Sequence, residues 1–398
     1  MKILKLETTR IAEHPNLLWV HVHTDSGVTG LGETFFGAEA VESYIHETAA
    51  PQIIGSDPRQ ISKIFNQLVP YVGANSSGVE MRGNSAIDIA LWDLLGKVTG
   101  QPIAQLLGGF TRDKIQTYNT CAGNSYMKDG VQKTANYGTM AGNGQYDDLN
   151  AFLERADDLA EDLLSEGISA MKIWPFDKAA EKSGGLYIDT DDLKQALLPF
   201  EKIRKRVGDR MEIMVEFHSM WQLPAAIKIA KALTPFDIFW HEDPIGMSNL
   251  SDLKRYVNET GASVGASETL ASRGAYRELL NANAAGAIIM DLSWCGGISE
   301  ARNIAAMAEA WQLPVAPHDC TGPVVLAAST HLSLNAPNAL FQESVRAFHR
   351  TWYGDLVTQL PPIENGMITV PLGAGLGLEL NPELERQFTV TRRSSEIH

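Results

Sequence analysis

Six polar side chains each end a short apolar run, and their types suit metal-assisted acid–base chemistry. They are separated by 23 to 27 residues and comprise Glu216, Glu242, Glu268, Asp291, His318 and Glu343. One βα unit of a barrel takes roughly 30 residues, because the fold uses about 250 residues for eight units. The spacing therefore predicts one functional side chain per strand, with all of them on the same rim.

Three of these side chains, Glu216, Glu242 and Glu268, are predicted to hold one divalent cation. Carboxylates on adjacent strand ends repel one another strongly in a partly dry site unless a counter-charge lies between them. Ligation by oxygen alone suits Mg²⁺. A single Glu after a strand is more often a solvated charge or the first residue of a helix. Three of them at near-equal spacing favour a shared metal site.

Two histidines and one lysine supply candidate proton-transfer and charge-neutralising groups. His318 is the predicted base, because the carboxylate of Asp291, one unit earlier, can reach its imidazole, fix its tautomer and raise its basicity. His218 lies two residues after Glu216, so strand alternation turns both side chains the same way. It is predicted to be a general acid, with an inert rim residue as the alternative. Lys172 is predicted to neutralise a substrate carboxylate, with a solvent-facing lysine as the alternative.

The elements that would position these groups are the strands and helices of a parallel α/β fold. From about residue 115, short apolar runs alternate with amphipathic helical stretches, as in βα units. The predicted strands cover 170–174, 211–216, 237–242, 263–268, 286–291, 314–318 and 339–343. The clearest helices are 223–233 and 299–311, whose apolar residues recur at helical spacing.

The organisation of the chain is predicted as three segments. Residues 1–114 read as an α+β domain, with a hairpin over 17–33 and a helix over 85–97. Residues 115–360 form the barrel, and 361–398 are expected to return to the first domain. The polar segments 127–148 and 175–187 each follow a predicted strand, where barrel enzymes carry substrate loops. We predict that both are active-site lids, with a disordered insertion as the alternative for the first.

Composition limits the classes of partner. The formal net charge of −15 over 398 residues argues against nucleic acid or an anionic membrane as the main partner. Neither a signal peptide nor a membrane-spanning run of about 18 apolar residues is expected. The three cysteines match no zinc or redox spacing, so a cytoplasmic location is expected. A small acidic substrate stays compatible with this charge, because a bound cation reverses the local field.

Several motifs resemble the enolase superfamily, and within it the mandelate racemase-like sugar-acid dehydratases. The resemblance covers nearly the whole chain and is carried by residues 85–97, Leu106-Leu107-Gly108-Gly109, His241-Glu242-Asp243-Pro244, Gly265-Ala266-Ser267-Glu268 and Pro317-His318. It implies a modified TIM barrel with an N-terminal α+β capping domain. It also implies one Mg²⁺ ion per active site on the three carboxylates, a small-molecule sugar acid as substrate, and a homo-oligomer, often an octamer.

The same resemblance implies roles for further residues. His318 with Asp291 would be the base, and Glu343 would hydrogen-bond the enediolate oxygen. Residues 30–37 resemble a capping loop that closes on the substrate. Selectivity would be set by that loop, by the lids and by three side chains, Arg82, Trp174 and Trp294.

Two departures from the family pattern bear on the reaction. Glu216 stands where the first metal ligand is commonly Asp. Lys172-Ile173-Trp174 replaces the Lys-x-Lys motif whose second lysine is a base on the opposite face of the substrate. Racemisation needs proton transfer on both faces, so this pattern favours dehydration of an aldonic or aldaric acid to a 2-keto-3-deoxy acid. The alternatives are a racemase, epimerase or cycloisomerase using Tyr126 or a lid residue, and a non-catalytic sugar-acid binding protein.

Overall fold

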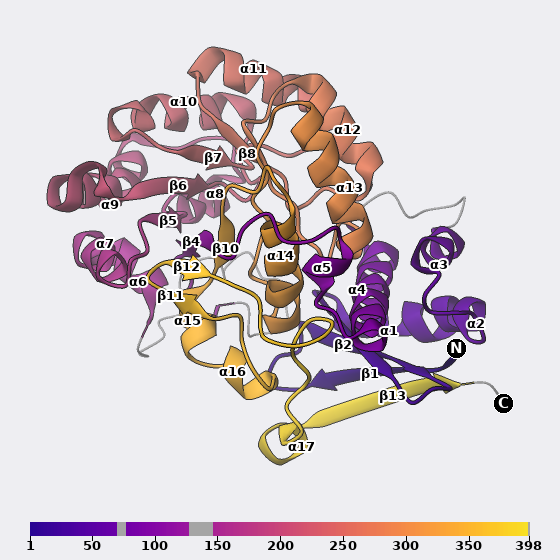
Figure 1. Cartoon of the computed structure of the whole chain (residues 1–398). Coiled ribbons are helices and arrows are strands. Elements are labelled where there is room, and N and C mark those ends of the chain that lie inside the picture. Colours follow the sequence, from indigo (N-terminus) through magenta and orange to yellow (C-terminus); the bar gives the residue numbers. More distant parts are fainter. Residues whose placement is uncertain (70–76, 127–145, 397–398) are drawn as a thin grey trace.

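The N-terminal part of the chain forms a four-stranded antiparallel sheet. This computed structural model describes residues 1–69, 77–126 and 146–396. The sheet has the order β13-β1-β2-β3, with β1 Ile3–Ile11, β2 Leu17–Thr24, β3 Thr29–Phe35 and β13 Val390–Glu396. The β2–β3 pair confirms the predicted hairpin. In Figure 1, β13 (yellow) runs along β1 (indigo), so the two ends of the chain share one sheet.

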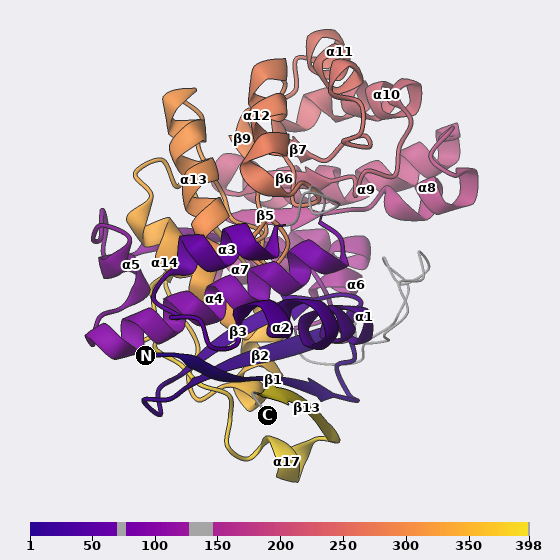
Figure 2. The ribbon, with the colours of Figure 1, turned by 90° about the vertical axis from the view of Figure 1, so that its right-hand side faces the viewer.

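One long helix, α4 Val79–Thr99, covers this sheet and includes the helix predicted over 85–97. The helix packs closely on β3, because Gly30 and Gly32 of that strand have no side chain that would keep the two backbones apart. A Cβ at these positions would lie 2.0 Å from the Ala90 carbonyl oxygen and 1.9 Å from that of Ala86. Figure 2 shows α4 between the sheet and the barrel. The smaller helices of this part are α1 Ala38–Tyr44, α2 Ala50–Ile53, α3 Ile61–Leu68 and α5 Ile103–Leu106, with a π-helical turn over Ile45–Ala49.

The second part is a barrel-like parallel sheet. Its strands are β4 Ile115–Thr120, β5 Ala170–Ile173, β6 Glu212–Glu216, β7 Trp240–Glu242, β8 Val264–Ala266, β9 Ala287–Ile288 and β10 Gln342–Ser344. They follow one another in chain order, and β10 pairs with β4. Between β9 and β10 the ladder is reduced to single bridges from Val315 to Ile288 and to Ala339. The strand predicted over 314–318 is therefore wrong in extent, because Pro314 and Pro317 have no amide hydrogen to donate.

Helices surround the sheet on the outside, as Figure 1 shows. They are α6 Asp148–Glu154, α7 Ala156–Ser165, α8 Asp177–Ser183, α9 Thr190–Val207, α10 Leu223–Leu233, α11 Leu250–Thr260, α12 Ser272–Ala282, α13 Gly297–Ala310 and α14 Pro323–Asn335. The chain ends through α15 Arg346–Arg350, α16 Tyr353–Leu356, the hairpin of β11 Ile363–Glu364 and β12 Met367–Ile368, and α17 Leu384–Gln387. The helices predicted over 223–233 and 299–311 are confirmed as α10 and α13.

The structure describes one of the two predicted lids and only the end of the other. The segment 175–187 contains α8, which buries Asp177, Ala179 and Ala180 against its neighbours. Most of the segment 127–148 lies outside the described residues, and α6 begins at its last residue, Asp148. None of the helices in the described ranges is both long and apolar enough to span a membrane.

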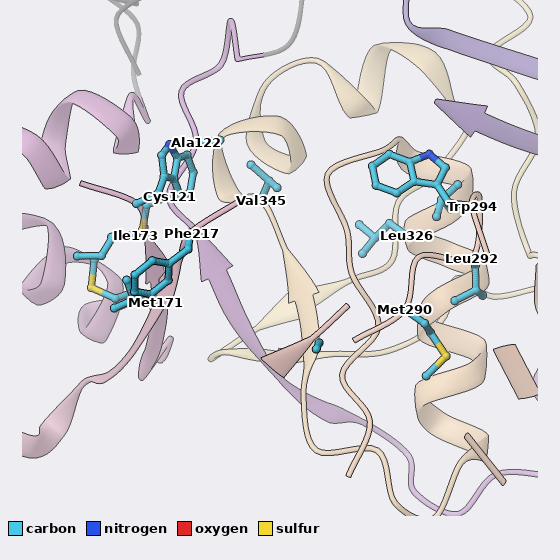
Figure 3. Packing of buried hydrophobic residues seen from close by; sticks show 14 of the residues in the cluster. Cys121, Ala122, Met171, Ile173, Phe217, Met290, Leu292, Trp294, Leu326 and Val345 are labelled. Atoms are coloured by element: carbon cyan, nitrogen blue, oxygen red, sulfur yellow. The ribbon is translucent and has the colours of Figure 1, made fainter. Parts of the chain in front are cut away.

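Side chains alternate along the barrel strands between the interior and the outer layer. Met171 and Ile173 of β5 point outward into the packed layer drawn in Figure 3. A separate cluster fills the interior and consists of Tyr118, Ala170, Met214, Trp240, Ala287, Ile289, Ala316 and Phe341. By the same alternation, Lys172, Glu216 and Glu242 face inward, one layer closer to the rim.

A buried histidine, His331 on α14, should make the folded state less stable at acid pH. The backbone amide of Ala104 donates to Nδ1 at 3.3 Å, which requires the neutral ring, and Nε2 donates to the carbonyl of Leu376 at 3.2 Å. Burial lowers the pKa of His331 to about 4. The folded state thus binds fewer protons than the unfolded state below about pH 6.5, and stability is lost as pH falls from there towards 4.

Replacing His331 by Gln, which can both donate and accept, should flatten this pH dependence. Between pH 7.5 and 4.5 the wild type should lose about 2–3 kcal/mol of unfolding free energy more than the variant, at roughly 1.4 kcal/mol per pH unit. Urea unfolding of both proteins at the two pH values measures the difference. Parallel losses in the two proteins would contradict the assignment.

Candidate active site

The three predicted metal ligands meet at the carboxyl ends of neighbouring strands. Glu216 ends β6 and is paired with Glu242, which ends β7. Glu268 follows β8 by two residues. One carboxylate oxygen from each residue lies within 4.8 Å of the others, and Glu216 and Glu242 are buried. Together they form an acidic triad that can hold a metal ion.

Neighbouring groups fix two of these carboxylates and leave one oxygen without a hydrogen bond. The amides of Phe217 and His218 donate to Glu216 Oε1 at 3.0 and 2.7 Å. Trp240 Nε1 donates to Glu242 Oε2 at 2.9 Å. Glu216 Oε2 is buried and accepts no hydrogen bond within the described part of the chain. Its ion-pair contact, Lys172 Nζ, lies 3.3 Å away, so this oxygen can still serve an oxygen-only triad that fits a hard divalent cation such as Mg²⁺.

Lys172 lies within this cluster and supplies its positive charge. Its Nζ is 2.5 Å from Glu242 Oε1, 3.0 Å from Glu343 Oε1 and 3.3 Å from Glu216 Oε2. Burial alone would lower the pKa of this lysine, but the surrounding carboxylates outweigh it and raise the pKa well above its ordinary value. The ammonium therefore stays charged and shares oxygens with any cation that binds the triad.

His318 and Asp291 form the predicted dyad. His318 Nδ1 lies 2.7 Å from Asp291 Oδ2, and Nε2 lies 3.3 Å from Glu268 Oε2. Ser293 donates to Asp291 Oδ1 from its amide at 2.6 Å and its hydroxyl at 2.5 Å. Thr321 adds a bond to Oδ2 at 3.0 Å. These donors fix the carboxylate, which in turn orients the imidazole with Nε2 towards the metal triad.

The pKa of His318 reflects the charges around it. Burial would lower this pKa, but the carboxylates of Glu268 and Glu343 raise it well above the ordinary histidine value. A divalent cation on the triad would offset part of that negative charge and favour the neutral ring. Metal binding and the protonation of His318 would then be linked.

His218 has a carboxylate partner that the sequence interpretation missed. Its Nδ1 lies 2.8 Å from Oδ2 of Asp177, the first residue of α8. β6 ends at Glu216 and His218 has a φ of 50°, so its direction does not follow from strand alternation as predicted. Burial alone would lower the pKa of His218, but Asp177 and Glu216 raise it to about 9. An Asp at the start of a helix usually has a capping role, so the sequence alone offered little reason to pair it with a histidine.

Glu343 lies beside Lys172 and does not line the cavity that is described below. Thr120 donates its hydroxyl to Glu343 Oε1 in a short hydrogen bond, and the amide of Asp319 donates to Oε2 at 2.9 Å. Thr120 was also missed by the sequence interpretation, because a threonine at a strand end has no distinctive signal.

Several of these residues border one cavity of about 490 Å³, its open mouth included. It is lined by Phe35, Phe36, Thr120, Tyr126, Lys172, Trp174, Glu216, His218, Glu268, Trp294, His318, Cys320 and Thr321. This lining combines charged groups and histidines with several aromatic rings. Both histidines, two of the triad carboxylates and two of the three predicted selectivity residues therefore face one space.

The family follows from this fold and from matches along the sequence. Residues 155–384 match the family described as "Enolase C-terminal domain-like". Residues 5–108 match "Mandelate racemase / muconate lactonizing enzyme, N-terminal domain". The chain belongs to the enolase superfamily. The resemblance seen in the sequence and the expected architecture, a capping domain on a modified TIM barrel, are confirmed, and the chain is an enzyme of this superfamily.

Solved structures and curated relatives agree with this placement. A crystal structure of a mandelate racemase-subgroup enolase from Agrobacterium tumefaciens is 62% identical, with a TM-score of 0.89, covering 100% of this chain and 99% of that one. An enolase from Sargasso Sea environmental sequencing is 43% identical, with a TM-score of 0.89 over 100% and 99% of the chains. A protein of Ralstonia pickettii named D-galactonate dehydratase is 30% identical, covering 100% of this chain and 95% of its own. One of the same name from Pectobacterium atrosepticum is also 30% identical, covering 96% and 93%.

Two family expectations take a different form in this superfamily member. Residues 30–37 are not mainly a loop, because β3 extends to Phe35 and leaves Phe36 and Gly37 beyond it. Arg82 does not line the cavity. Its guanidinium lies 5.8 Å from the ring of Phe36 and 5.4 Å from that of Trp294, and it donates to the Phe36 carbonyl at 3.3 Å. Arg82 thus contacts the wall rather than the space inside it.

Replacing Lys172 by Met should tighten Mg²⁺ binding to this enolase-superfamily site while reducing turnover. Like charges about 4 Å apart repel by roughly 4 kcal/mol per unit pair at an effective dielectric constant of 20. Removing the ammonium is therefore expected to lower the Kd for Mg²⁺ by at least about tenfold, measured by isothermal titration calorimetry. Turnover should fall by about 10²-fold, because the cavity loses a buried positive charge.

The matched control for this change is Lys178→Met, which removes an exposed lysine of α8. That variant should leave the Kd and turnover as in the wild type. An unchanged Mg²⁺ affinity in Lys172→Met would show that the lysine and the cation do not share the triad.

Proposed function

We propose that this enzyme is a Mg²⁺-dependent dehydratase of an aldonic or aldaric acid. It would remove the proton next to the carboxylate and eliminate the β-hydroxyl, giving a 2-keto-3-deoxy acid. The observation that carries the proposal is that two carboxylate-paired histidines, His318 and His218, line the same cavity as two carboxylates of the acidic triad. Elimination of water needs one group to take a proton and another to give one.

The curated relatives support this reaction class. Several of them are named D-galactonate dehydratase and align with nearly the whole chain at about 30% identity. That identity leaves the sugar and its stereochemistry open. A cytoplasmic location and a homo-oligomeric state stay predictions of the sequence.

Glu216, Glu242 and Glu268 would hold the Mg²⁺ ion. When bound, the ion would stabilise the negative charge that develops on the substrate carboxylate as the α-proton leaves. Lys172 lines the same cavity and adds a fixed positive charge. Glu343 does not line the cavity, so we propose that it acts by holding Lys172 and Thr120 in place.

His318 would take the α-proton at Nε2. Its Nδ1–H is held by Asp291, which fixes the tautomer that leaves Nε2 able to accept. His218 would donate a proton to the departing β-hydroxyl. Trp174 stands where many relatives have a second lysine, and its ring lines the cavity. Elimination is therefore favoured over racemisation, which needs a second base on the opposite face.

A panel of aldonic and aldaric acids with Mg²⁺ tests the proposal. Formation of a 2-keto-3-deoxy acid, detected as its semicarbazone and by mass spectrometry, is the expected result for at least one member. His318→Asn, assayed in parallel, should give none. Incorporation of solvent deuterium without any keto-acid product would instead indicate an epimerase or racemase.

A further inference from the structure

The partner of His218 comes from an element outside the acidic triad. Asp177 follows β5 and begins α8, while His218 follows β6. The carboxylate of Asp177 is 3% exposed and its Oδ2 lies 2.8 Å from His218 Nδ1. An ionised carboxylate can only accept, so the imidazole donates through Nδ1–H. This bond fixes the proton on Nδ1 and the orientation of the ring.

The cavity walls show which way the other nitrogen faces. His218 lines the cavity that holds Lys172 and His318, whereas Asp177 does not. Asp177 instead lines a neighbouring pocket between α6, α8 and α9. The Nδ1 edge of the ring is thus turned away from the substrate space and the Nε2 edge is turned towards it. Trp174, 5.7 Å away with its ring at 76° to the imidazole, packs beside this ring.

The dyad repeats the geometry of Asp291 and His318. In both, an Asp Oδ2 contacts Nδ1, at 2.8 Å in one and 2.7 Å in the other. For His318 this leaves Nε2 3.3 Å from Glu268 Oε2, at the edge of the triad. The cavity is therefore bordered by two imidazoles that are each oriented by a buried carboxylate.

The backbone at His218 supports a functional reason for this placement. His218 and Ser219 have φ values of 50° and 57°, a left-handed conformation that residues with side chains rarely adopt. The amide of Ser219 donates to the carbonyl of Asp243 at 2.9 Å and holds the turn. Strained backbone of this kind persists where surrounding contacts over-determine it, often at functional sites.

We propose that Asp177 is a positioning residue that makes His218 the proton donor for the leaving hydroxyl. The inference rests on the proposed dehydration. As the bond between the β-carbon and oxygen breaks, its electron pair leaves with the oxygen, which takes the proton from His218 Nε2 and departs as water. His318 takes the α-proton, and solvent then restores both histidines. Throughout, Asp177 accepts the hydrogen bond from Nδ1–H of His218 and so holds the orientation of the ring. It also stabilises the protonated imidazole before the transfer.

The purely structural alternative is that Asp177 only anchors α8. The two roles differ in which step depends on the carboxylate. An anchor would affect every reaction in the cavity alike, whereas a positioning residue for the acid affects departure of the hydroxyl more than removal of the α-proton.

The experiment compares Asp177→Asn with wild type on a sugar acid that the enzyme accepts. Keto-acid formation and incorporation of solvent deuterium at the α-carbon are measured together. We expect dehydration to fall by about 10²-fold, as for loss of a general acid, and the ratio of dehydration to exchange to fall by at least about tenfold. A 3-deoxy-3-fluoro analogue, whose fluoride departs without a proton, should be processed by the variant at a rate much closer to wild type. Equal losses on the hydroxyl and fluoro compounds would overturn the proposal.

Glu181→Gln is the matched control, because it removes an exposed carboxylate one turn further along α8. It should leave both rates and their ratio as in wild type. A drop in the ratio like that of Asp177→Asn would show that the negative charge of the helix, rather than the dyad, matters.

A second measurement separates this inference from the proposed function. In ¹⁵N-histidine-labelled enzyme, the His218 ring should show a protonated, hydrogen-bonded Nδ1, assigned by its loss in His218→Asn. This signal should change in Asp177→Asn and persist in Glu181→Gln. Its absence from the wild type would overturn the dyad even if sugar acids are dehydrated. Its presence without any dehydration would reject the proposed reaction while keeping the pairing.

Discussion

Replacing His318 by Asn should lower both α-proton exchange and dehydration by at least about 10³-fold. A positioned base typically contributes 10²–10⁴-fold, and here the base is also oriented by a buried partner. Nε2 of His318 lies 3.3 Å from Glu268 Oε2, beside the triad where the substrate carboxylate would bind. Both exchange and elimination begin with removal of the α-proton by His318. The two rates should therefore fall together, as measured by deuterium incorporation and keto-acid formation.

This joint loss is what distinguishes the base from the acid. Asp177→Asn should change the ratio of the two rates, whereas His318→Asn should lower both. Mg²⁺ affinity and the circular dichroism spectrum should be retained in His318→Asn, because the substitution leaves all three triad ligands in place. His349→Asn, on α15 and bonded to the carbonyl of Pro361, is a control that should leave activity per folded molecule unchanged. Exchange that survives in His318→Asn would assign the base elsewhere.

Much of the barrel and its acidic rim could be predicted from two simple properties of β-strands. Side chains alternate along a strand, and the carboxyl ends of parallel strands share one edge. These two facts were enough to predict that Glu216, Glu242 and Glu268 meet, and the structure brings their oxygens within 4.8 Å. The pairing of Asp291 with His318 followed from the same spacing. Such predictions need only local sequence and the repeat length of the fold.

Where local rules compete, the sequence interpretation was less accurate. The run 314–318 is apolar enough for a strand, but its two prolines reduce it to a single bridging residue, Val315. Lys172 was predicted to neutralise a substrate carboxylate, and it does line the cavity, but the sequence did not show that it also contacts carboxylates from three other strands. Those contacts depend on the three-dimensional arrangement of the whole rim. The spacing of residues along one strand cannot predict them.

Contacts between the two parts of the chain were beyond the sequence altogether. Glu33 on β3 accepts the amides of Val324 and Val325 at 3.0 and 2.9 Å, across 291 and 292 residues of chain. It thereby caps the first turn of α14, a few residues after His318. Burial raises the pKa of Glu33 to about 8 despite these donors. The capping domain thus fixes the start of the helix that follows His318, a link visible only once both parts are folded.

Stripping divalent ions should abolish dehydration, and Glu242→Gln should reproduce most of that loss. Glu242 is fully buried, pairs with Glu216 across the sheet, and is held by Trp240. Replacing one of three anionic ligands by a neutral amide weakens both the charge and the geometry that a hard cation needs. We expect turnover to fall by at least about 10³-fold in each case, because the charge that develops on the substrate would lose its main stabilisation. Added Mg²⁺ should restore the stripped wild type but not the variant.

The control lies at the other end of the same sheet. Glu212 begins β6 and is exposed, so Glu212→Gln removes an equal charge without touching the rim. Thermal unfolding with and without Mg²⁺ then separates the triad from any other cation site. Binding to the native state alone raises the unfolding temperature, so Mg²⁺ should stabilise wild type and Glu212→Gln but have little effect on Glu242→Gln. Full turnover after chelation, or an equal Mg²⁺ shift in Glu242→Gln, would contradict a catalytic metal on this triad.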